Sequence, residues 1–335
     1  MQRDISDITI IGGGPTGLYA AFFAGMRELS VRLIDSLPEL GGQLMALYPE
    51  KYIYDVGGFP KVLARELGRN LITQALQFDP QVILDEEILG LAREGDLWVL
   101  HGKTGLYATR TLLLAGGKGA FEPLRLKCPG YEEFLGRGVD FAITDPEEYR
   151  GKRILLVGGG DSAVDWALAL KDVAADTLLI HRRGSFRALE RSVGQLEAAS
   201  QAGELSFRDH HEVREIRGSD RVESVTIFEN RSGQDTTLQV DAVLTFLGFK
   251  LDLGPMKKWG LDLLRNRVVV DRLMRTNLDG VFAVGDMVDY EGKLDLIATG
   301  FSEAAVAVSQ AVRMVDPNAR VNPGHSTNMK IFKDS

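Results

Sequence analysis

Residues 8–17 read ITIIGGGPTG, and residues 154–163 read ILLVGGGDSA. Each stretch is a short apolar run followed by a glycine-rich turn, and each turn leads into a segment with helical spacing of apolar residues. A further apolar run follows each predicted helix, at residues 31–34 and at residues 177–180. The order strand, turn, helix, strand therefore occurs twice, and such units build parallel sheets that helices cover on both faces.

The glycines of both turns follow the spacing G-x-G-x-x-G, with alanine as the permitted last residue of the second turn. In this pattern one glycine allows the tight turn, one lets the backbone approach a pyrophosphate, and one lets helix and strand pack closely. The helix that follows offers free N–H groups and a partial positive charge to the phosphates. The turn positions predicted to contact cofactors are Gly12, Gly14, Thr16 and Gly17 in the first turn, and Gly158, Gly160, Asp161, Ser162 and Ala163 in the second.

The residue after the next strand is expected to select the nucleotide. In the first unit it is Asp35, and a carboxylate there accepts hydrogen bonds from ribose hydroxyls and repels a 2′-phosphate, which predicts FAD or NAD(H). The second unit has His181, Arg182 and Arg183 there, with Arg187 close behind. The planar fork of arginine suits a phosphate dianion, so this unit is predicted to bind NADP(H). Two such sites in one chain suggest that a flavin receives hydride from a nicotinamide.

The composition excludes several other classes of protein. A chain of 335 residues corresponds to about two domains. Its formal net charge of −8 argues against a dedicated nucleic-acid binder. A single cysteine, Cys128, forbids a disulfide within the chain and fits a reducing compartment, the cytoplasm. No apolar run suggests a membrane span or a signal peptide, and we predict no metal site.

The predicted fold class is α/β, with two doubly wound Rossmann-like dinucleotide-binding domains, the second inserted into the first. Residues 112–117 (LLLAGG) are expected to be a strand that closes the first domain. Residues 280–284 and the helix after Gly300 have no glycine turn of their own, and we interpret them as a return into the first domain. The expected boundaries are 1–118 for the first part of an FAD domain, 119–247 for an NADPH domain, and 248–335 for the second part of the FAD domain.

Taken together, these motifs resemble the thioredoxin reductase superfamily of flavoproteins, over nearly the whole chain. The resemblance rests on the two glycine turns, on Gly41-Gly42-Gln43, on residues 181–183 and on Gly285-Asp286. Thioredoxin reductases carry a CxxC pair just before the second turn. Here Ala142 and Asp145 stand in those places, so the dithiol relay is absent.

Within that superfamily the chain is similar to the ferredoxin–NADP reductases built on the same plan. Residues 47–55 (LYPEKYIYD) and the tail at 322–327 (NPGHST) carry this narrower resemblance. It implies that Tyr48 stacks on one face of the flavin ring, and that the tail carries His325 over the other face at a homodimer interface. An aromatic ring can stack there with a gain of about 0.5–1.5 kcal/mol beyond area burial.

The same resemblance implies the other flavin contacts. Asp286 would hold the ribitol chain, and the helix after residue 299 would stabilise negative charge on the reduced flavin. The candidate catalytic residues are His325 and Ser326, which would tune the flavin or move a proton. The flavin contacts implied are Gly42, Gln43, Tyr48, Ile88, Phe121, Gly285, Asp286 and Thr327.

The sequence thus predicts an FAD-dependent reductase that passes hydride from NADPH to the flavin and then single electrons to ferredoxin or flavodoxin. The resemblance implies that its two domains rotate, with hinges near Gly117 and Gly248. Lys51, Lys61 and Arg65 are candidates for contacts with the carrier protein. Two alternatives stay open: an NADPH oxidase or diaphorase that reduces oxygen or a quinone, and a flavin-binding redox sensor without sustained turnover.

Overall fold

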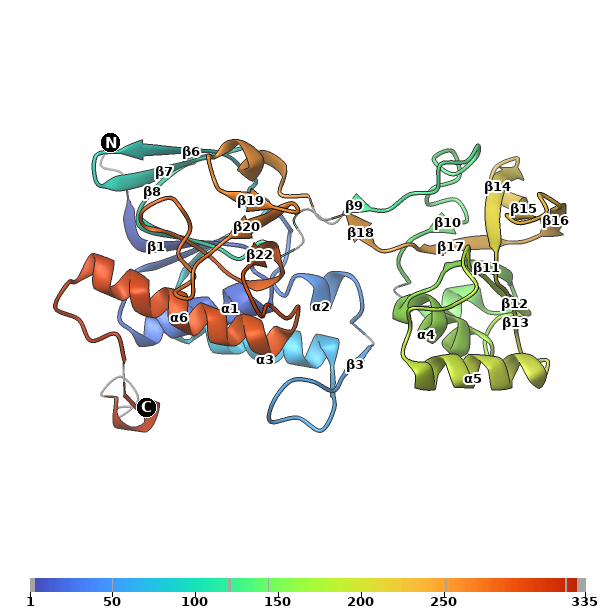
Figure 1. Cartoon of the computed structure of the whole chain (residues 1–335), viewed down its shortest axis with the longest axis horizontal. Helices are drawn as coiled ribbons and strands as arrows, with labels where there is room; N and C mark the ends of the chain where they lie inside the picture. The colour runs from blue at the N-terminus through green and yellow to red at the C-terminus, as the bar shows by residue number, and fades with distance from the viewer. Residues whose placement is uncertain are drawn as a thin grey trace. The chain divides into compact units, whose positions relative to one another are not determined.

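The structure is a computed structural model that describes residues 4–49, 51–117, 119, 122–143, 145–250, 252–322 and 324–329. The chain divides into two compact units (Figure 1). Unit 1 comprises residues 1–121 and 251–335, and unit 2 comprises residues 122–250. The assignment of an FAD domain and an NADPH domain to particular boundaries stays a prediction.

Unit 1 is built on a seven-stranded sheet with the order β5-β2-β1-β8-β7-β6, in which β21 also pairs with β8. Five strands pair in parallel with one another, namely β1 (Ile5–Ile11), β2 (Val31–Ile34), β5 (Gln81–Ile83), β8 (Leu106–Leu114) and β21 (Val281–Ala283), and β8 also pairs antiparallel with β7. The antiparallel strands are β6 (Ile88–Glu94) and β7 (Leu97–Gly102). Because β21 pairs with the last residues of β8, the chain returns to the first unit as the sequence predicted.

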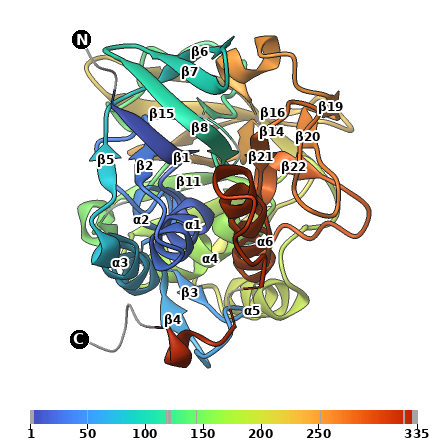
Figure 2. The ribbon, with the colours of Figure 1, turned by 90° about the vertical axis from the view of Figure 1, so that its left-hand side faces the viewer.

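Two helices of unit 1, α1 (Pro15–Met26) and α6 (Ile297–Val315), lie side by side against the sheet, with α3 (Ala64–Ala75) beside α1 (Figure 2). Their apolar faces and the inner strands form one core, in which Ile10, Leu33 and Leu113 have no exposed surface. The expected start of α6 near Gly300 is wrong by about one turn. Gly300 is inside the helix, where its N–H donates to the Leu296 carbonyl, and its missing side chain leaves room for Thr16.

The other elements of unit 1 are short and border the sheet. They are α2 (Gln43–Ala46), β3 (Tyr52–Ile53), β4 (Val62–Leu63), η1 (Leu76–Phe78), η3 (Gly254–Lys258), β19 (Leu263–Leu264), β20 (Arg267–Val269), η4 (Gly285–Met287), β22 (Val288–Asp289) and η5 (Ser326–Asn328).

Unit 2 has a five-stranded parallel sheet with the order β10-β17-β11-β12-β13, which packs against α4 (Asp161–Leu170) and α5 (Glu190–Gln201). A three-stranded antiparallel sheet, β14-β15-β16, packs on the other face of the five-stranded sheet and forms a second core with it. The strands are β10 (Val139–Asp140), β11 (Arg153–Gly158), β12 (Asp176–Ile180), β13 (Ser206–Arg208), β14 (His211–Gly218), β15 (Val222–Glu229), β16 (Asp235–Gln239) and β17 (Ala242–Phe246). Unit 2 also contains η2 (Pro146–Tyr149) and the pair β9 (Glu122–Pro123) and β18 (Phe249–Lys250).

The two units share the strand–turn–helix–strand order that the sequence predicted, and each has parallel strands at the centre of a Rossmann-like arrangement. In unit 2 the second face of the parallel sheet is covered by β14-β15-β16 rather than by helices. The predicted α/β fold class is therefore confirmed. Among the described helices, none combines the length and the apolarity that crossing a membrane requires.

Candidate functional site

The first glycine turn joins β1 to α1, and its glycines serve two different purposes. Gly12 has a φ of +111°, and a Cβ at Gly12 or at Gly17 would overlap neighbouring backbone oxygens. These two positions are glycine because the turn packs tightly. A Cβ at Gly14 would meet no atom within 4 Å, and the backbone there is ordinary. The open side of the turn at Gly14 therefore fits the close approach of a pyrophosphate to the backbone.

Asp35 follows β2 and is fastened to this turn. Its Oδ2 accepts the Gly13 N–H at 2.5 Å and its Oδ1 accepts the Leu37 N–H at 2.8 Å, while the residue is 8% exposed. Burial raises the pKa of the Asp35 carboxyl, and the backbone N–H donors act in the opposite direction. Each oxygen keeps a further lone pair, so the carboxylate can still accept a hydrogen bond from a ribose hydroxyl.

The segment 41–43 lies directly on the glycine turn. The Gly41 N–H donates to the Gly13 carbonyl at 2.9 Å, and a Cβ at Gly42 would stand 2.8 Å from the Cα of Gly14. The amide of Gln43 points toward Gly117, since a Cβ there would lie 3.8 Å from its Nε2. The sequence motif Gly41–Gln43 is thus brought together with the first turn.

The segment just before β6 also reaches this region. The N–H of Glu86 donates to the Asp35 carbonyl at 3.0 Å, and Ile88 follows two residues later as a buried residue. The backbone of Ile88 is therefore close in sequence to a segment that contacts Asp35. Phe121, the other predicted backbone contact, lies outside the described residues.

Gly285 and Asp286 are brought to the same turn by Thr16. A Cβ at Gly285 would stand 3.3 Å from the Thr16 Oγ1, and a Cβ at Gly300 would overlap that oxygen. Burial raises the pKa of Tyr48 to about 12, and the charges of Asp286 and Asp55 add to the shift. Unit 1 therefore gathers the glycine turn, Tyr48 and the Gly285–Asp286 turn around one end of its parallel strands, where ligands of such sheets bind.

A buried network that sequence reasoning missed supports this turn. Glu303 on α6 accepts the Gly285 N–H at 2.6 Å, the Tyr290 hydroxyl at 2.7 Å and the Lys293 ammonium at 2.7 Å. Burial and the Glu303 carboxylate raise the pKa of Tyr290, so its hydroxyl stays a donor. The available signal was an acidic residue within the apolar face of a helix, at GFSEAAVA.

The tail residues His325, Ser326 and Thr327 are exposed. Their turn is held by local bonds, such as the one from the Asn328 N–H to the His325 carbonyl. Figure 1 shows this last segment beyond the C-terminal end of α6, away from α2 and β22. Within one chain the tail is not brought to the glycine turn, and its catalytic role stays a prediction.

The second glycine turn joins β11 to α4 and has the same pattern of one crowded and one open glycine as the first. A Cβ at Gly158 would stand 2.5 Å from the Phe246 carbonyl oxygen, whereas a Cβ at Gly160 would meet nothing within 4 Å. Ala163 is buried and Ser162 is exposed. The open position again falls at the middle glycine, so this turn too can receive a pyrophosphate.

His181 lies behind this turn. The residue is 6% exposed, a Cβ at Gly159 would overlap its ring, and its Nε2 donates to the Ser185 carbonyl at 3.0 Å. Burial lowers the pKa of His181, helped by the charges of Arg187 and the two arginines that follow the histidine. The ring therefore packs as a neutral group, and the structure gives it a supporting place that the sequence did not predict.

The basic side chains of the same loop face solvent. Arg182, Arg183 and Arg187 are all exposed. Three guanidinium groups on one short loop beside a glycine turn can bind a phosphate dianion.

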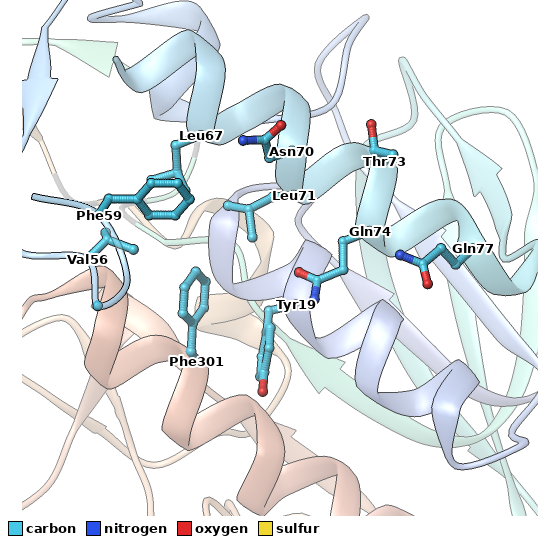
Figure 3. A pocket seen from close by; sticks show the side chains of 11 residues that line it. Tyr19, Val56, Phe59, Leu67, Asn70, Leu71, Thr73, Gln74, Gln77 and Phe301 are labelled. Atoms are coloured by element: carbon cyan, nitrogen blue, oxygen red, sulfur yellow. The ribbon is translucent and has the colours of Figure 1, made fainter. Parts of the chain in front are cut away.

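Unit 1 also contains a cavity of about 380 Å³ between α1, α3 and the first turns of α6. Figure 3 shows Tyr19, Phe59, Leu71 and Phe301 around it, with Gln74 at its polar side. None of the glycine-turn residues lines this cavity.

Burial disfavours the thiolate form of the lone cysteine. Cys128 is half-buried, and burial raises its pKa to about 11, so the thiol stays protonated at neutral pH. Among the described residues, no group of three or more His, Cys, Asp or Glu side chains could hold a metal ion.

Comparisons with known proteins agree with this geometry. The family model described as pyridine nucleotide-disulphide oxidoreductase matches residues 6–311. A ferredoxin--NADP reductase of Thermus thermophilus is 49% identical over 328 residues, which cover 98% of each chain. A ferredoxin--NADP reductase 2 of Oceanobacillus iheyensis is 45% identical over 331 residues, covering 98% of this chain and all of that protein.

Solved structures give the same picture of the fold. The thioredoxin reductase of Lactococcus lactis, in its FR conformation, superposes with a TM-score of 0.80 at 26% identity, covering 92% of this chain and 99% of that one. The thioredoxin reductase of T. acidophilum superposes with a TM-score of 0.81 at 22% identity, covering 92% and 98%.

Proposed function

We propose a function from one premise: this chain belongs to the pyridine nucleotide-disulphide oxidoreductase family, and within it to the ferredoxin–NADP reductases with a thioredoxin reductase-like fold. It is an oxidoreductase with FAD and NADP(H) as cofactors. Its electron acceptor is an iron–sulfur ferredoxin or a flavodoxin. A lone cysteine fits a reducing compartment, and we place the protein in the cytoplasm.

One observation carries this proposal: two open glycine turns stand in a chain that has a single cysteine. Gly14 and Gly160 each leave room for a pyrophosphate, one in each unit. A family member that reduces disulfides through its own thiols needs a cysteine pair, and Ala142 and Asp145 occupy the places of that pair in thioredoxin reductases. With no thiol pair to receive them, the electrons leave from the flavin itself.

The residues of unit 1 fit FAD. The Gly14 backbone and the first N–H groups of α1 would hold the pyrophosphate, and Asp35 would accept from the adenosine ribose. Asp286 would hold the ribitol chain, with Tyr48 packed against the ring. FAD, when bound, takes up two electrons from a nicotinamide and releases them one at a time.

The residues of unit 2 fit NADPH rather than NADH. The turn at Gly160 and the start of α4 would hold the pyrophosphate. Arg182, Arg183 and Arg187 would bind the 2′-phosphate, because each guanidinium can donate two parallel hydrogen bonds to phosphate oxygens.

The tail supports a further part of the proposal. His325 and Ser326 do not reach the glycine turn of their own chain, so they would act on the flavin of a second copy in a homodimer. The docking surface for the carrier would include Lys61, whose ammonium lies 4.7 Å from the ring centre of the exposed Tyr52. Weak electron-transfer encounters need only small interfaces.

Anaerobic stopped-flow tests the proposed acceptor. The NADPH-reduced protein is mixed with oxidised ferredoxin, and flavin reoxidation is followed by absorbance. The proposal expects reoxidation by ferredoxin far faster than reoxidation by oxygen or by a quinone. A ferredoxin rate no faster than the oxygen rate would instead identify an oxidase or diaphorase, and an absence of steady-state NADPH oxidation with any acceptor would identify a redox sensor.

A further inference from the structure

The loop between β12 and α5, residues 181–189, is tied to the second glycine turn at two points near its end. The Arg187 N–H donates to the Gly159 carbonyl at 2.7 Å, and the Leu189 N–H donates to the Asp161 Oδ1 at 2.9 Å. Asp161 is the first residue of α4, and Leu189 directly precedes α5. One carboxylate therefore links the start of the pyrophosphate-binding helix to the end of the arginine loop.

The first half of the loop has other supports. The His181 ring stacks on Phe186 with ring centres 5.3 Å apart and donates to the Ser185 carbonyl. The Asn230 amide donates to the Arg182 carbonyl at 2.9 Å. Asp161 is the side chain whose hydrogen bond holds the second half, between Arg187 and the start of α5.

We propose that Asp161 is a positioning residue that determines the preference for the 2′-phosphate of NADP(H), acting through Leu189 and Arg187. It holds the backbone of the loop so that the exposed arginines stand over the phosphate site before the coenzyme arrives, which lowers the entropic cost of binding. This inference rests on the proposed NADPH site in unit 2.

The charge of Asp161 makes the proposal distinctive. A carboxylate in the first turn of α4 repels an anion bound at that helix end, so charge alone predicts that removing it strengthens phosphate binding. If Asp161 instead acts by positioning the loop, a variant that loses the acceptor atom should bind the 2′-phosphate more weakly. The two explanations therefore differ in the sign of the effect.

The test measures direct binding of 2′,5′-ADP and of 5′-AMP to the FAD-loaded protein by calorimetry, which needs no turnover. The preference for the 2′-phosphate is measured as the dissociation constant of 5′-AMP divided by the dissociation constant of 2′,5′-ADP. Asp161→Ala should reduce this ratio by roughly three- to tenfold, since water replaces part of the lost bond. Asp161→Asn has the same loss of charge but keeps the acceptor oxygen, and should leave the ratio unchanged or raise it.

A second variant removes the donor of the same bond. Leu189 has a φ of −56°, which proline adopts, so Leu189→Pro deletes the N–H and keeps the φ of this residue. Leu189→Pro should also reduce the ratio, and adding Asp161→Ala to it should change the ratio no further. If Asp161→Ala does not fold, the comparison of Leu189→Pro with the wild type decides.

The possible failures are distinguishable. A wild-type protein that binds 2′,5′-ADP no better than 5′-AMP would overturn the proposed NADPH site. A normal wild-type preference that survives in Asp161→Ala, or in Leu189→Pro, would overturn only the role of Asp161. An equal reduction in Asp161→Ala and Asp161→Asn would show that the acceptor oxygen, which asparagine keeps, does not hold the loop, and would also overturn the role of Asp161.

Discussion

The Lys293 ammonium lies 2.7 Å from the Glu303 carboxylate, and the two side chains are only 4% and 3% exposed. The same carboxylate accepts the Gly285 N–H, so this ion pair fixes the turn that carries Asp286. A buried ion pair remains stable when its remaining lone pairs are satisfied, and here Tyr290 and Gly285 satisfy them. The pair therefore connects the interior of α6 to the proposed flavin site.

Breaking this pair from one side should destabilise unit 1. Lys293→Met leaves a buried carboxylate without its cation, at a cost of about 3–5 kcal/mol in the free energy of unfolding. The double variant Lys293→Met with Glu303→Gln removes both charges and should recover most of that loss. Urea unfolding measures the effect, with the fluorescence of released flavin as the signal. Equal stability of the single variant and the wild type would contradict it.

The two kinds of glycine in the first turn should respond differently to alanine. Residue 14 has ordinary backbone angles, and a Cβ there would lie in open space. The Gly14→Ala protein should therefore fold but bind FAD at least about tenfold more weakly. Gly17→Ala overlaps the Gly12 carbonyl and should lower the stability of the apoprotein by about 1–3 kcal/mol or more. Circular dichroism of the apoprotein and flavin absorbance after reconstitution separate the two effects. A Gly14→Ala protein with full FAD affinity would argue against the pyrophosphate at this turn.

Removing two of the loop arginines should change coenzyme preference. Each charge-assisted bond contributes about 1.5–3 kcal/mol, so Arg182→Ala with Arg183→Ala should raise the Michaelis constant for NADPH by roughly two orders of magnitude. The Michaelis constant for NADH should change little. Arg231→Ala, which removes an exposed arginine from the β15–β16 turn of the same unit, is the matched control. Parallel losses with both coenzymes would show that these arginines do not bind the 2′-phosphate.

The stability of unit 2 should fall in mild acid because of His181. Burial lowers the folded pKa of this histidine below its ordinary value of 6.5, so the unfolded chain takes up a proton first. The contribution of His181 to the free energy of unfolding is constant above about pH 6.5. Below that pH the free energy of unfolding decreases until the pH reaches the folded pKa of the histidine.

His181→Gln keeps an N–H donor for the Ser185 carbonyl but does not titrate. Urea unfolding at about pH 7.5 and about pH 5.5 should therefore show a smaller difference for this variant than for the wild type. An identical pH dependence in both proteins would assign the acid sensitivity to other groups.

Local patterns in the sequence were sufficient for the strand–turn–helix units. The spacing of Gly12, Gly14 and Gly17 is a local steric requirement, because backbone angles and close contacts within a few residues demand it. The alternation of apolar runs with helical segments likewise predicted two parallel sheets. The arginines after β12 were also found from the sequence, because a strand of known direction delivers its last residues to the ligand edge of the sheet.

Other features depend on contacts between segments that are distant in sequence. The sequence could not place the Glu303 carboxylate against Gly285, turn the His181 ring inward beneath Gly159, or start α6 one turn before Gly300. It also could not show that Asp161 holds Leu189, or that the tail stays away from the glycine turn of its own chain. The sequence by itself determined which segments form the two sheets and their turns, because those requirements are local. Only the tertiary structure decided which buried polar groups meet, because each must find its hydrogen-bond partner from another part of the chain.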